Sequence, residues 1–456
     1  MKSFDIAIIK KYGFNPMSLP YILGSIMFME YFDGAALNLI FPELASSFNV
    51  SPIFMKISLT VYLITEAIFI PVCGYLSHKI NLKTLLQVGI ILLFIGSIGC
   101  VFSNNIISFI IFRSFQGISA AFITPICRLF VLKKFNKDNR LEAINKIMGI
   151  ALIGLVMGPF LSAFLVIYYS WKLIFVMFAI FSGISLFITW LVIPSYKDEV
   201  NERFDIIGYL VLSLALVSFF AFFSMTINDN QNYIHVVFLI ASILLLKIYF
   251  VFSRKNNTAI ISRELIEDKQ FLMGLLSNFI FRVLFGGVIF ACSYMLQIYL
   301  KYPLIKSAIC LSLYGMGMIL GKILVKPITL NYGYKKLLVY NSLCLALLTL
   351  LISIEMIFNS FYILYLTLFI YGLSATVQYS GMNIVSLNEI KNSLHAKANV
   401  TLNIVRLLGT NFGISLSALF LGMQNVKFQY IFLLIFSVYG GIGLVGSGLF
   451  KKMNIG

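Results

Sequence analysis

The sequence predicts an all-α integral membrane protein that crosses the bilayer many times. Hydrophobic residues make up 60% of the 456 residues and charged residues only 11%, whereas a soluble protein of this size needs a more charged exterior. The apolar residues form long stretches, each close to the roughly 20 residues with which a helix crosses a hydrocarbon core. Lipid offers no hydrogen-bond partner to an open backbone, so each stretch is predicted to be an α-helix.

Fourteen such stretches follow one another along the chain, with short connections between them. They are placed at about 19–41, 54–76, 84–103, 105–132, 143–167, 171–194, 206–227, 234–253, 271–293, 305–326, 337–357, 360–385, 396–423 and 428–450. The connections leave no room for a soluble domain large enough to hold an enzyme, so no catalytic site is expected.

Basic residues are concentrated in alternate connections between these stretches. They are Lys79 and Lys83; Lys133, Lys134, Lys137 and Arg140; Lys197 and Arg203; Arg254, Lys255, Arg263 and Lys269; Lys335 and Lys336; Lys391 and Lys397; and Lys451 and Lys452. Cytoplasmic loops of membrane proteins are enriched in lysine and arginine. Topology therefore explains the net charge of +17, and no nucleic-acid partner is expected. The pattern places both termini in the cytoplasm and requires an even number of spans.

Several chemistries are not expected from this sequence. Residues 1–18 are mixed and basic, unlike a cleaved signal peptide, and are expected to form a cytoplasmic segment. All six cysteines fall in predicted spans without the spacing of metal ligands, so they are expected to be buried thiols and no metal site is expected. The chain has no phosphate-binding Gly-x-x-x-x-Gly-Lys-Ser/Thr run. An ion gradient, rather than a cofactor or ATP, would have to drive any uphill transport.

Four segments of the first half carry specific motifs. They are MEYFDGAALNLIFPEL at 29–44, GYLSHKINLKTLL at 74–86 after the second stretch, FRSFQGISAAFITP at 112–125 and GIALIGLVMGPFLSAFL at 149–165. Together they resemble the major facilitator superfamily, and within it the 14-span drug:proton antiporter family. RLFVLKK at 128–134 also resembles the MdtD-type bacterial members of that family. The matching positions are Asp33, Asn38 and Pro42 in the first segment, Gly74 in the second, Arg113, Gln116 and Gly117 in the third, and Gly158 and Pro159 in the fourth.

The resemblance implies a major facilitator fold with two six-helix bundles, at 19–200 and 257–456, and two added helices at 201–256. Substrate would bind at the midplane between the bundles, and rocking of the bundles would expose it to either side in turn. The resemblance also implies a monomeric protein, and the Gly158-Pro159 motif implies antiport.

One motif departs from the family. The segment at 74–86 carries His78 and Asn81 where the family has an aspartate and a second glycine. In the family that aspartate is thought to latch the two halves on the cytoplasmic side. A neutral imidazole offers no anion, and a protonated one would repel the neighbouring Lys79, so the latch here is expected to be weaker and sensitive to pH.

Ionisable residues inside spans usually face a cavity or a partner. Glu30 and Asp33 are three residues apart and therefore share a helix face. A carboxyl group that gains and loses a proton is what proton coupling requires, and Arg113 in the fourth stretch is a natural counter-charge. The alternative is a permanent structural ion pair between the first and fourth stretches. Glu66 is either a second proton or cation site or a carboxyl group hydrogen-bonded to a neighbouring helix.

The second half contributes two arginines at similar depth, Arg282 and Arg406. They would either bind an anionic substrate or pair with the acidic residues across a central cavity, and the sequence favours neither. Gln378 and Asn383, in the stretch before Arg406, could add uncharged polar contacts to a substrate.

These observations together predict a proton-coupled secondary transporter that exports small molecules, of the multidrug-efflux type, from a bacterial cytoplasm across the inner membrane. Its partners would be a small-molecule substrate, protons and the lipid bilayer. Alternatives are an exporter of a siderophore, a carboxylate or another metabolite, or an importer by symport. A more distant alternative is a non-transporting membrane sensor or scaffold, for which an appended soluble domain or long tail would be expected.

The topology can be tested by labelling single cysteines with a membrane-impermeant reagent. Because the basic connections are expected to face the cytoplasm, cysteines placed at Lys137 and Lys451 should react only from that side. A cysteine at Asn230, in a connection of the other kind, should react only from the opposite side. Reaction of Lys137 and Asn230 from the same side would contradict the fourteen-span topology.

Overall fold

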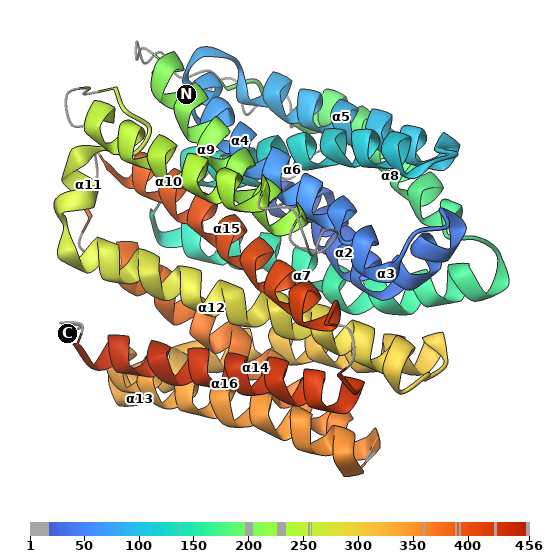
Figure 1. Ribbon diagram of the computed structural model, residues 1–456. Coiled ribbons are helices and arrows are strands. Elements are labelled where there is room, and N and C mark those ends of the chain that lie inside the picture. The colour runs from blue at the N-terminus through green and yellow to red at the C-terminus, as the bar shows by residue number, and fades with distance from the viewer. Residues whose placement is uncertain are drawn as a thin grey trace.

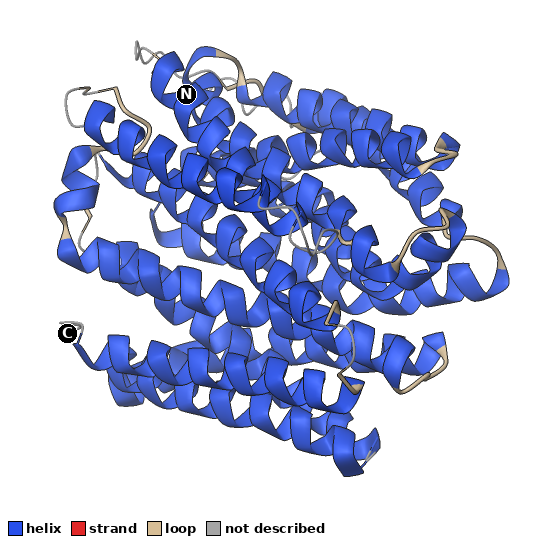
Figure 2. Cartoon of the chain, in the orientation of Figure 1, coloured by secondary structure: helices blue, strands red, loops and turns tan. Residues whose placement is uncertain are grey.

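Helices form all the regular structure that the computed structural model describes in this chain. Figure 2 shows them running roughly along one common direction. The structure describes residues 18–135, 137–196, 204–225, 234–253, 256, 258–358, 361–387, 390–391, 394–423 and 426–452. The expected cytoplasmic segment 1–18 therefore lies outside the described residues except for Ser18, as do Asn230 and the basic residues Lys197, Arg203, Arg254 and Lys255.

The helices of the first half pack mainly on one another. They are α2 (Leu19–Ser47), the short α3 (Pro52–Met55), α4 (Ile57–Lys79), α5 (Leu82–Phe102), α6 (Ile106–Lys134), α7 (Lys137–Tyr168) and α8 (Lys172–Val192). Within this group, α2 lies along α7, α4 along α6, and α5 between α6 and α8. Figure 1 shows the group running from blue through cyan to blue-green.

The helices of the second half form another such group. They are α11 (Arg263–Glu267), α12 (Lys269–Tyr294) with its π-helical continuation η2 (Met295–Tyr299), α13 (Leu304–Phe358), α14 (Phe361–Leu387), α15 (His395–Leu421) and α16 (Phe428–Lys452). Here α12 lies along α15, and α13 packs on both α14 and α16. Figure 1 shows this group in yellow, orange and red.

The long helix α13 consists of two arms, 304–332 and 334–358, joined at Gly333. The backbone there has φ +73° and ψ 164°, outside the helical region. A side chain would strain that conformation, whereas glycine adopts it readily. The two stretches predicted at 305–326 and 337–357 therefore correspond to two helical arms rather than one continuous rod.

Eleven helices in the described part of the chain are long and apolar enough to cross a membrane. This count takes the two arms of α13 as one helix, Leu304–Glu355, and it includes neither α2 nor the shorter apolar Ile206–Phe222 of α9. The chain is thus a multi-pass membrane protein with an all-helical fold. The count of fourteen spans and the boundaries 19–200, 201–256 and 257–456 stay predictions.

Two further helices, α9 (Ile206–Met225) and α10 (Ile234–Ser253), pack against each other. Together they form a small buried cluster with residues from both halves: Ala67 of α4 and Ile404 of α15 pack with Phe220 and Tyr249. Outward-facing residues of α10, such as Val237 and Ile243, are more than half exposed. This exposure fits a helix pair whose outer face contacts lipid.

The connection after the second predicted stretch is shorter than the sequence suggested. Helix α4 continues to Lys79 and α5 begins at Leu82, so only Ile80 and Asn81 remain of the connection that the stretches 54–76 and 84–103 left between them. Asn81 begins the next helix by accepting hydrogen bonds from the backbone N–H of Lys83 at 2.9 Å and of Tyr196 at 3.0 Å. A helix cap of this kind needs a side-chain oxygen, which the family's glycine could not supply.

Close approach of α7 to α2 depends on glycine. A Cβ atom on Gly154 would lie 2.5 Å from the carbonyl oxygen of Phe28, and one on Gly158 would lie 2.8 Å from that of Phe32. Both distances are shorter than side-chain atoms tolerate, so only glycine lets the two backbones meet here. Within the antiporter-type motif, Gly158 therefore sets how closely the two helices pack.

The second half repeats this contact between α15 and α12. A Cβ atom on Gly409 would lie 2.7 Å from the carbonyl oxygen of Phe279, and one on Gly413 would lie 2.1 Å from that of Val283. Glycines four residues apart thus meet carbonyls four residues apart in both halves. The repeat is structural evidence that the two bundles are built on one plan, as inverted or parallel transporter repeats are.

The two halves also touch one another at several places. On one side, Ser312 of α13 donates a hydrogen bond to the carbonyl oxygen of Val156 in α7 at 2.9 Å. On another, Ser293 of α12 donates to the carbonyl oxygen of Asn38 in α2, and Gln297 donates to that of Leu39 at 2.7 Å. Helices α4 and α15 form a third contact. Apolar packing accompanies these polar groups, as where the rings of Phe41 in α2 and Phe290 in α12 stack.

The glycine packing predicts a selective loss of stability. Gly413→Ala should lower the melting temperature of the purified protein by several degrees, because the new methyl group has no space against α12 and such overpacking costs about 1–3 kcal/mol. Gly441→Ala is the matched control, since a Cβ atom there meets nothing within 4 Å. Equal melting temperatures for the two variants in detergent would contradict the proposed close packing.

Candidate functional site

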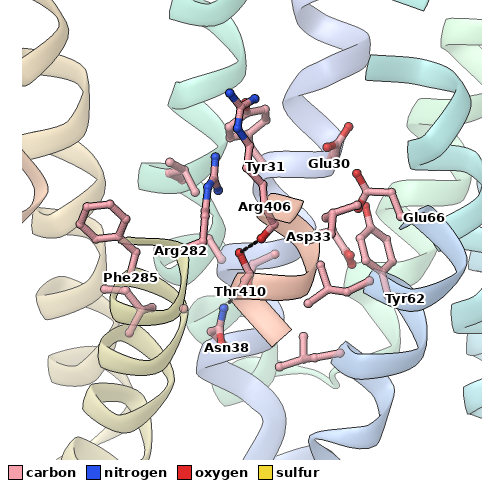
Figure 3. Close-up of a pocket in the computed structure, with 18 of the residues that line it drawn as sticks. Glu30, Tyr31, Asp33, Asn38, Tyr62, Glu66, Arg282, Phe285, Arg406 and Thr410 are labelled. Carbon is pink, nitrogen blue, oxygen red and sulfur yellow. Dashed lines mark hydrogen bonds between the residues drawn. The ribbon is translucent and has the colours of Figure 1, made fainter. Parts of the chain in front are cut away.

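A cavity of about 350 Å³ lies between the two halves. Its wall is formed by α2, α4, α6 and α7 on one side and by α12, α13, α14 and α15 on the other. Figure 3 shows how the labelled side chains converge on it. Seven charged residues line it: Glu30, Asp33, Glu66, Arg113, Arg128, Arg282 and Arg406.

Asp33 and Arg113 form a buried ion pair between α2 and α6. The Nη1 atom of Arg113 lies 2.9 Å from both carboxylate oxygens of Asp33, and the two residues are only 5% and 1% exposed. The guanidinium group also lies 4.7 Å from the ring centre of Tyr62. The expected pairing of the two residues is thus confirmed. A buried pair of this kind is costly to break by removing one partner, because the other charge is left without compensation.

Gln116 holds the arginine in place. Its Oε1 atom accepts a hydrogen bond from Arg113 Nη1 at 2.5 Å, while its Nε2 atom donates to Ser97 of α5 at 2.9 Å. One residue later, a Cβ atom on Gly117 would lie 2.3 Å from the carbonyl oxygen of Tyr62. The Arg-x-x-Gln-Gly motif thus supplies a charge, a group that orients it and a close approach of α6 to α4.

The second half has no charge at the equivalent position. A Cβ atom on Gly372 of α14 would lie 2.0 Å from the carbonyl oxygen of Tyr314 in α13, as one on Gly117 of α6 would meet a carbonyl of α4. Four residues before each of these glycines stand Leu368 and Arg113, and both are buried. The ion pair is therefore a feature of the first half alone, added to a scaffold that both halves share.

Glu30 and Glu66 line the first-half side of the cavity. Glu30 accepts a hydrogen bond from the hydroxyl group of Thr124 in α6. Within the described part of the chain, neither glutamate has a basic group within 4.0 Å. Glu66 also makes no hydrogen bond in that part of the chain, so the alternative in which it bonds to a neighbouring helix has no support.

Arg406 of α15 is held by neutral side chains. It donates hydrogen bonds to Asn278 at 3.2 Å, to Asn403 at 3.1 Å and to Asn383. Three amide oxygens fix the direction of the guanidinium group without neutralising its charge. Asn383 does not line the cavity, so its place is behind Arg406 rather than against a substrate.

Arg282 of α12 lies with its guanidinium carbon 4.1 Å from the ring centre of Tyr379. In the described chain no hydrogen bond accompanies this cation–π contact, and no carboxylate comes within 4.0 Å of either Arg282 or Arg406. In Figure 3 the guanidinium groups of both arginines point the same way, with Glu30 and Glu66 on the other side. Of the two alternatives for these arginines, pairing with the acids is therefore not observed.

Gln378 does not belong to the cavity wall. It accepts a hydrogen bond from Asn341 at 2.8 Å and donates one to Ser342 at 3.0 Å, which ties α14 to α13. It is fully buried in that contact, so its position does not support the substrate contact that the sequence suggested.

The residues expected to act in conformational change are divided between two places. Pro159 lines the cavity, next to the packing contact of Gly158. Gly74, His78 and Lys79 lie in the last turns of α4, away from the cavity. A Cβ atom on Gly74 would lie 3.5 Å from Val400 of α15, so this end of α4 does face the other half. The pH-sensitive latch at His78 stays a prediction.

Sequence reasoning missed some residues of this site. Arg128 lies in the predicted stretch 105–132 and lines the cavity, so the rule that singled out the other buried charges would have found it. Tyr31 and Tyr314 carried no signal, because tyrosine is common at helix contacts. Outside the cavity, Glu355 is another buried carboxyl group: it is 7% exposed and accepts a hydrogen bond from Thr367 at 2.5 Å.

The site's chemistry is that of charge recognition. Its carboxyl groups can exchange protons, and its arginines can hold an anionic group. Among the described residues no cluster of three or more His, Cys, Asp or Glu side chains could hold a metal ion. The six cysteines are free thiols, and Cys344 alone among them is not fully buried.

The ion pair predicts a non-additive effect on stability. Asp33→Asn should lower the melting temperature strongly, because an unpaired buried charge costs about 3–5 kcal/mol. Adding Arg113→Gln should restore most of the loss, since the two amides can bond to each other. The same changes at Glu267 and Arg263, an exposed pair 2.6 Å apart, should have almost no effect. Additive losses at Asp33 and Arg113 would show that the pair is not a unit.

Comparisons with known proteins agree with this geometry. The model of the Major Facilitator Superfamily matches residues 23–414. The putative multidrug resistance protein MdtD of Escherichia coli (strain K12) is 26% identical over 404 residues, which cover 88% of this chain and 86% of that protein. The same protein of Shigella sonnei (strain Ss046) matches with the same identity and coverage.

Two solved structures share the fold. The human organic anion transporter MFSD10 has a TM-score of 0.66 at 13% identity, with 96% of this chain and 100% of that chain covered. A D-xylose-proton symporter has a TM-score of 0.70 at 13% identity, with 95% of this chain and 96% of that chain covered. With two halves built on one plan around a central cavity, and a family match over most of its length, this chain belongs to the major facilitator superfamily of membrane transporters.

Proposed function

We propose that the protein is a secondary transporter that uses the proton gradient, without a cofactor, to export small molecules from the cytoplasm. The observation that carries this proposal is the buried Asp33–Arg113 ion pair in the wall of a cavity between two similar halves. A transporter needs a site that both sides of the membrane can reach in turn, and coupling needs a proton-binding group within it.

Asp33 is the proposed coupling group. While it is ionised, its charge holds Arg113 and thereby attracts α6 to α2. A proton on Asp33 removes that charge, so Arg113 retains only Gln116 and the ring of Tyr62 as partners. Both helices line the cavity, and the change in attraction between them is a local event that can bias the whole bundle toward one state.

The contacts between the halves are the proposed moving parts. Ser312 bonds to α7, while Ser293 and Gln297 bond to α2. Apolar packing accompanies these bonds, as in the stacked rings of Phe41 and Phe290. The bonds to α7 and to α2 come from different helices, so one set can open while another stays closed. Alternating access then requires rotation of two rigid bundles, and the glycine-packed helix pairs stay intact within each bundle.

The relatives support export and proton coupling, but they do not identify the substrate. MdtD is described as a putative multidrug resistance protein, and the xylose transporter is a proton symporter. We place the protein in the bacterial inner membrane with both termini in the cytoplasm, as the distribution of basic residues predicts. We expect it to act as a monomer, with no nucleic-acid partner.

The coupling proposal can be tested in proteoliposomes with an imposed pH gradient. Asp33→Asn should abolish gradient-driven accumulation of a transported dye, because the amide cannot release a proton. It should leave exchange of that dye without a gradient largely intact. Glu355→Gln is the control, since Glu355 is a buried carboxyl group outside the cavity. It should keep gradient-driven transport.

Full gradient-driven transport by Asp33→Asn would refute the role of Asp33 and shift it to Glu30 or Glu66. A panel of cationic, anionic and zwitterionic dyes is needed for this assay. A protein that moves none of the dyes, with or without a gradient, would count against small-molecule export itself.

A further inference from the structure

The two walls of the central cavity differ in charge. The second-half wall contributes Arg282 and Arg406 and, among its described lining residues, no acidic side chain. The first-half wall contributes Glu30 and Glu66, the paired Asp33 and Arg113, and Arg128. In the described chain the two glutamates and the two second-half arginines have no oppositely charged group within 4.0 Å.

The second-half wall, with Arg282 and Arg406, is suited to bind an anionic group. Arg406 is fixed by amide oxygens that leave its charge intact, and Arg282 is fixed against the ring of Tyr379. A buried charge without a partner is unfavourable, and guanidinium groups match the two oxygens of a carboxylate or the oxygens of a phosphate. The structure thus leaves two oriented donors facing a space that a carboxylate could fill.

The glutamates of the first-half wall, Glu30 and Glu66, are suited to bind a cation or protons. Glu30 receives one hydrogen bond from Thr124, and Glu66 receives none from the described chain. One basic residue outside the ion pair does lie on this side: Arg128, one helical turn beyond Thr124, directs an Nη atom toward the sulfur of Met148 at 3.9 Å. It forms no ion pair with a described acidic residue, so both glutamates remain available to a positively charged group.

We infer that the substrate of this cavity is a small organic zwitterion, with its anionic end on Arg282 and Arg406 and its cationic end toward Glu30 and Glu66. This inference rests on the proposed function and narrows its substrate class. A simple anion would leave the glutamates without a partner, and a simple cation would leave the arginines without one. A zwitterion satisfies both walls with one molecule.

The arrangement also accounts for exchange against protons. A proton and the cationic end of the substrate compete for the same glutamates, so each favours release of the other. Such competition is what an antiporter requires, because the two ligands must not travel together. An anion alone would not produce it, since protonation of the glutamates would strengthen its binding.

The middle of the substrate is expected to be aromatic. Tyrosines and a phenylalanine line the cavity between the charged groups: Tyr31, Tyr62, Tyr314, Tyr379 and Phe285. A volume of about 350 Å³ holds a bicyclic aromatic amino acid with space for water. Aromatic rings favour stacked or edge-on contact with such a molecule.

Matched probes can test the charge requirement directly. L-tryptophan, indole-3-propionate and tryptamine share a ring system but are a zwitterion, an anion and a cation. Phenylalanine, 3-phenylpropionate and 2-phenylethylamine form a second such set. Equilibrium binding of the radiolabelled compounds to the purified full-length protein should favour the zwitterion in at least one set by about tenfold or more over both of its partners, since each loses a charge-assisted contact.

Substitutions should remove the preference for the zwitterion by weakening binding of its anionic end or of its cationic end separately. Arg282→Gln should weaken the zwitterion and the anion but not the cation, and Glu66→Gln should weaken the zwitterion and the cation but not the anion. Arg406→Gln should act like Arg282→Gln, provided that size-exclusion chromatography shows the variant to be folded. Arg263→Gln and Glu267→Gln remove the same charges from an exposed pair and should change nothing.

The outcomes separate this inference from the proposed function. Equal binding of zwitterion and anion, equal binding of zwitterion and cation, or no binding of either zwitterion would overturn the assignment of substrate class. None of these results touches proton-driven transport, which the dye assay measures independently. Conversely, a protein that binds tryptophan with the predicted charge pattern but shows no gradient-driven transport would refute the proposed function alone.

Discussion

A carboxylate and a guanidinium group buried together between α2 and α6 constrain much of the first half. Asp33 and Arg113 can remain charged in that place because each compensates the other. Gln116 then fixes the arginine, and Gly117 allows α6 to lie against α4 closely enough for Tyr62 to cover the pair. A proton on the carboxyl group would remove one charge from the middle of this arrangement, so a small chemical change there has consequences for several helices.

The comparison of the two halves shows what has been added to the common scaffold. Glycines four residues apart on α7 and α15 meet carbonyls of α2 and α12 in the same register. Asp33 follows the second carbonyl in the first half, and Leu284 follows it in the second half, so these two positions correspond. Arg113 and Leu368 correspond in the same way. Both leucines are fully buried. The packing is therefore shared by the halves, whereas the ion pair belongs to one, and the second half carries two arginines held by neutral groups.

Much of this could be predicted from the sequence, for physical reasons that also set its limits. Apolar length locates helices well, and a charge in an apolar stretch must have a partner, which identified Asp33 and Arg113. Near-uniform hydrophobicity, however, hides which face of a helix meets the cavity. Gln378 was expected there and instead joins α14 to α13. The second stretch was predicted to end at 76 because polar residues mark span ends, although helix α4 continues to Lys79.

The central claim is that Asp33 takes up and releases a proton while Arg113 remains charged. Infrared difference spectroscopy of the protein in lipid vesicles, recorded at a series of falling pH values, measures this most directly. A protonated carboxyl group has a carbonyl stretch that a carboxylate lacks. The account predicts such a band in the unmodified protein, weaker in Asp33→Asn and unchanged in Glu355→Gln. An identical band in Asp33→Asn and the unmodified protein would contradict it.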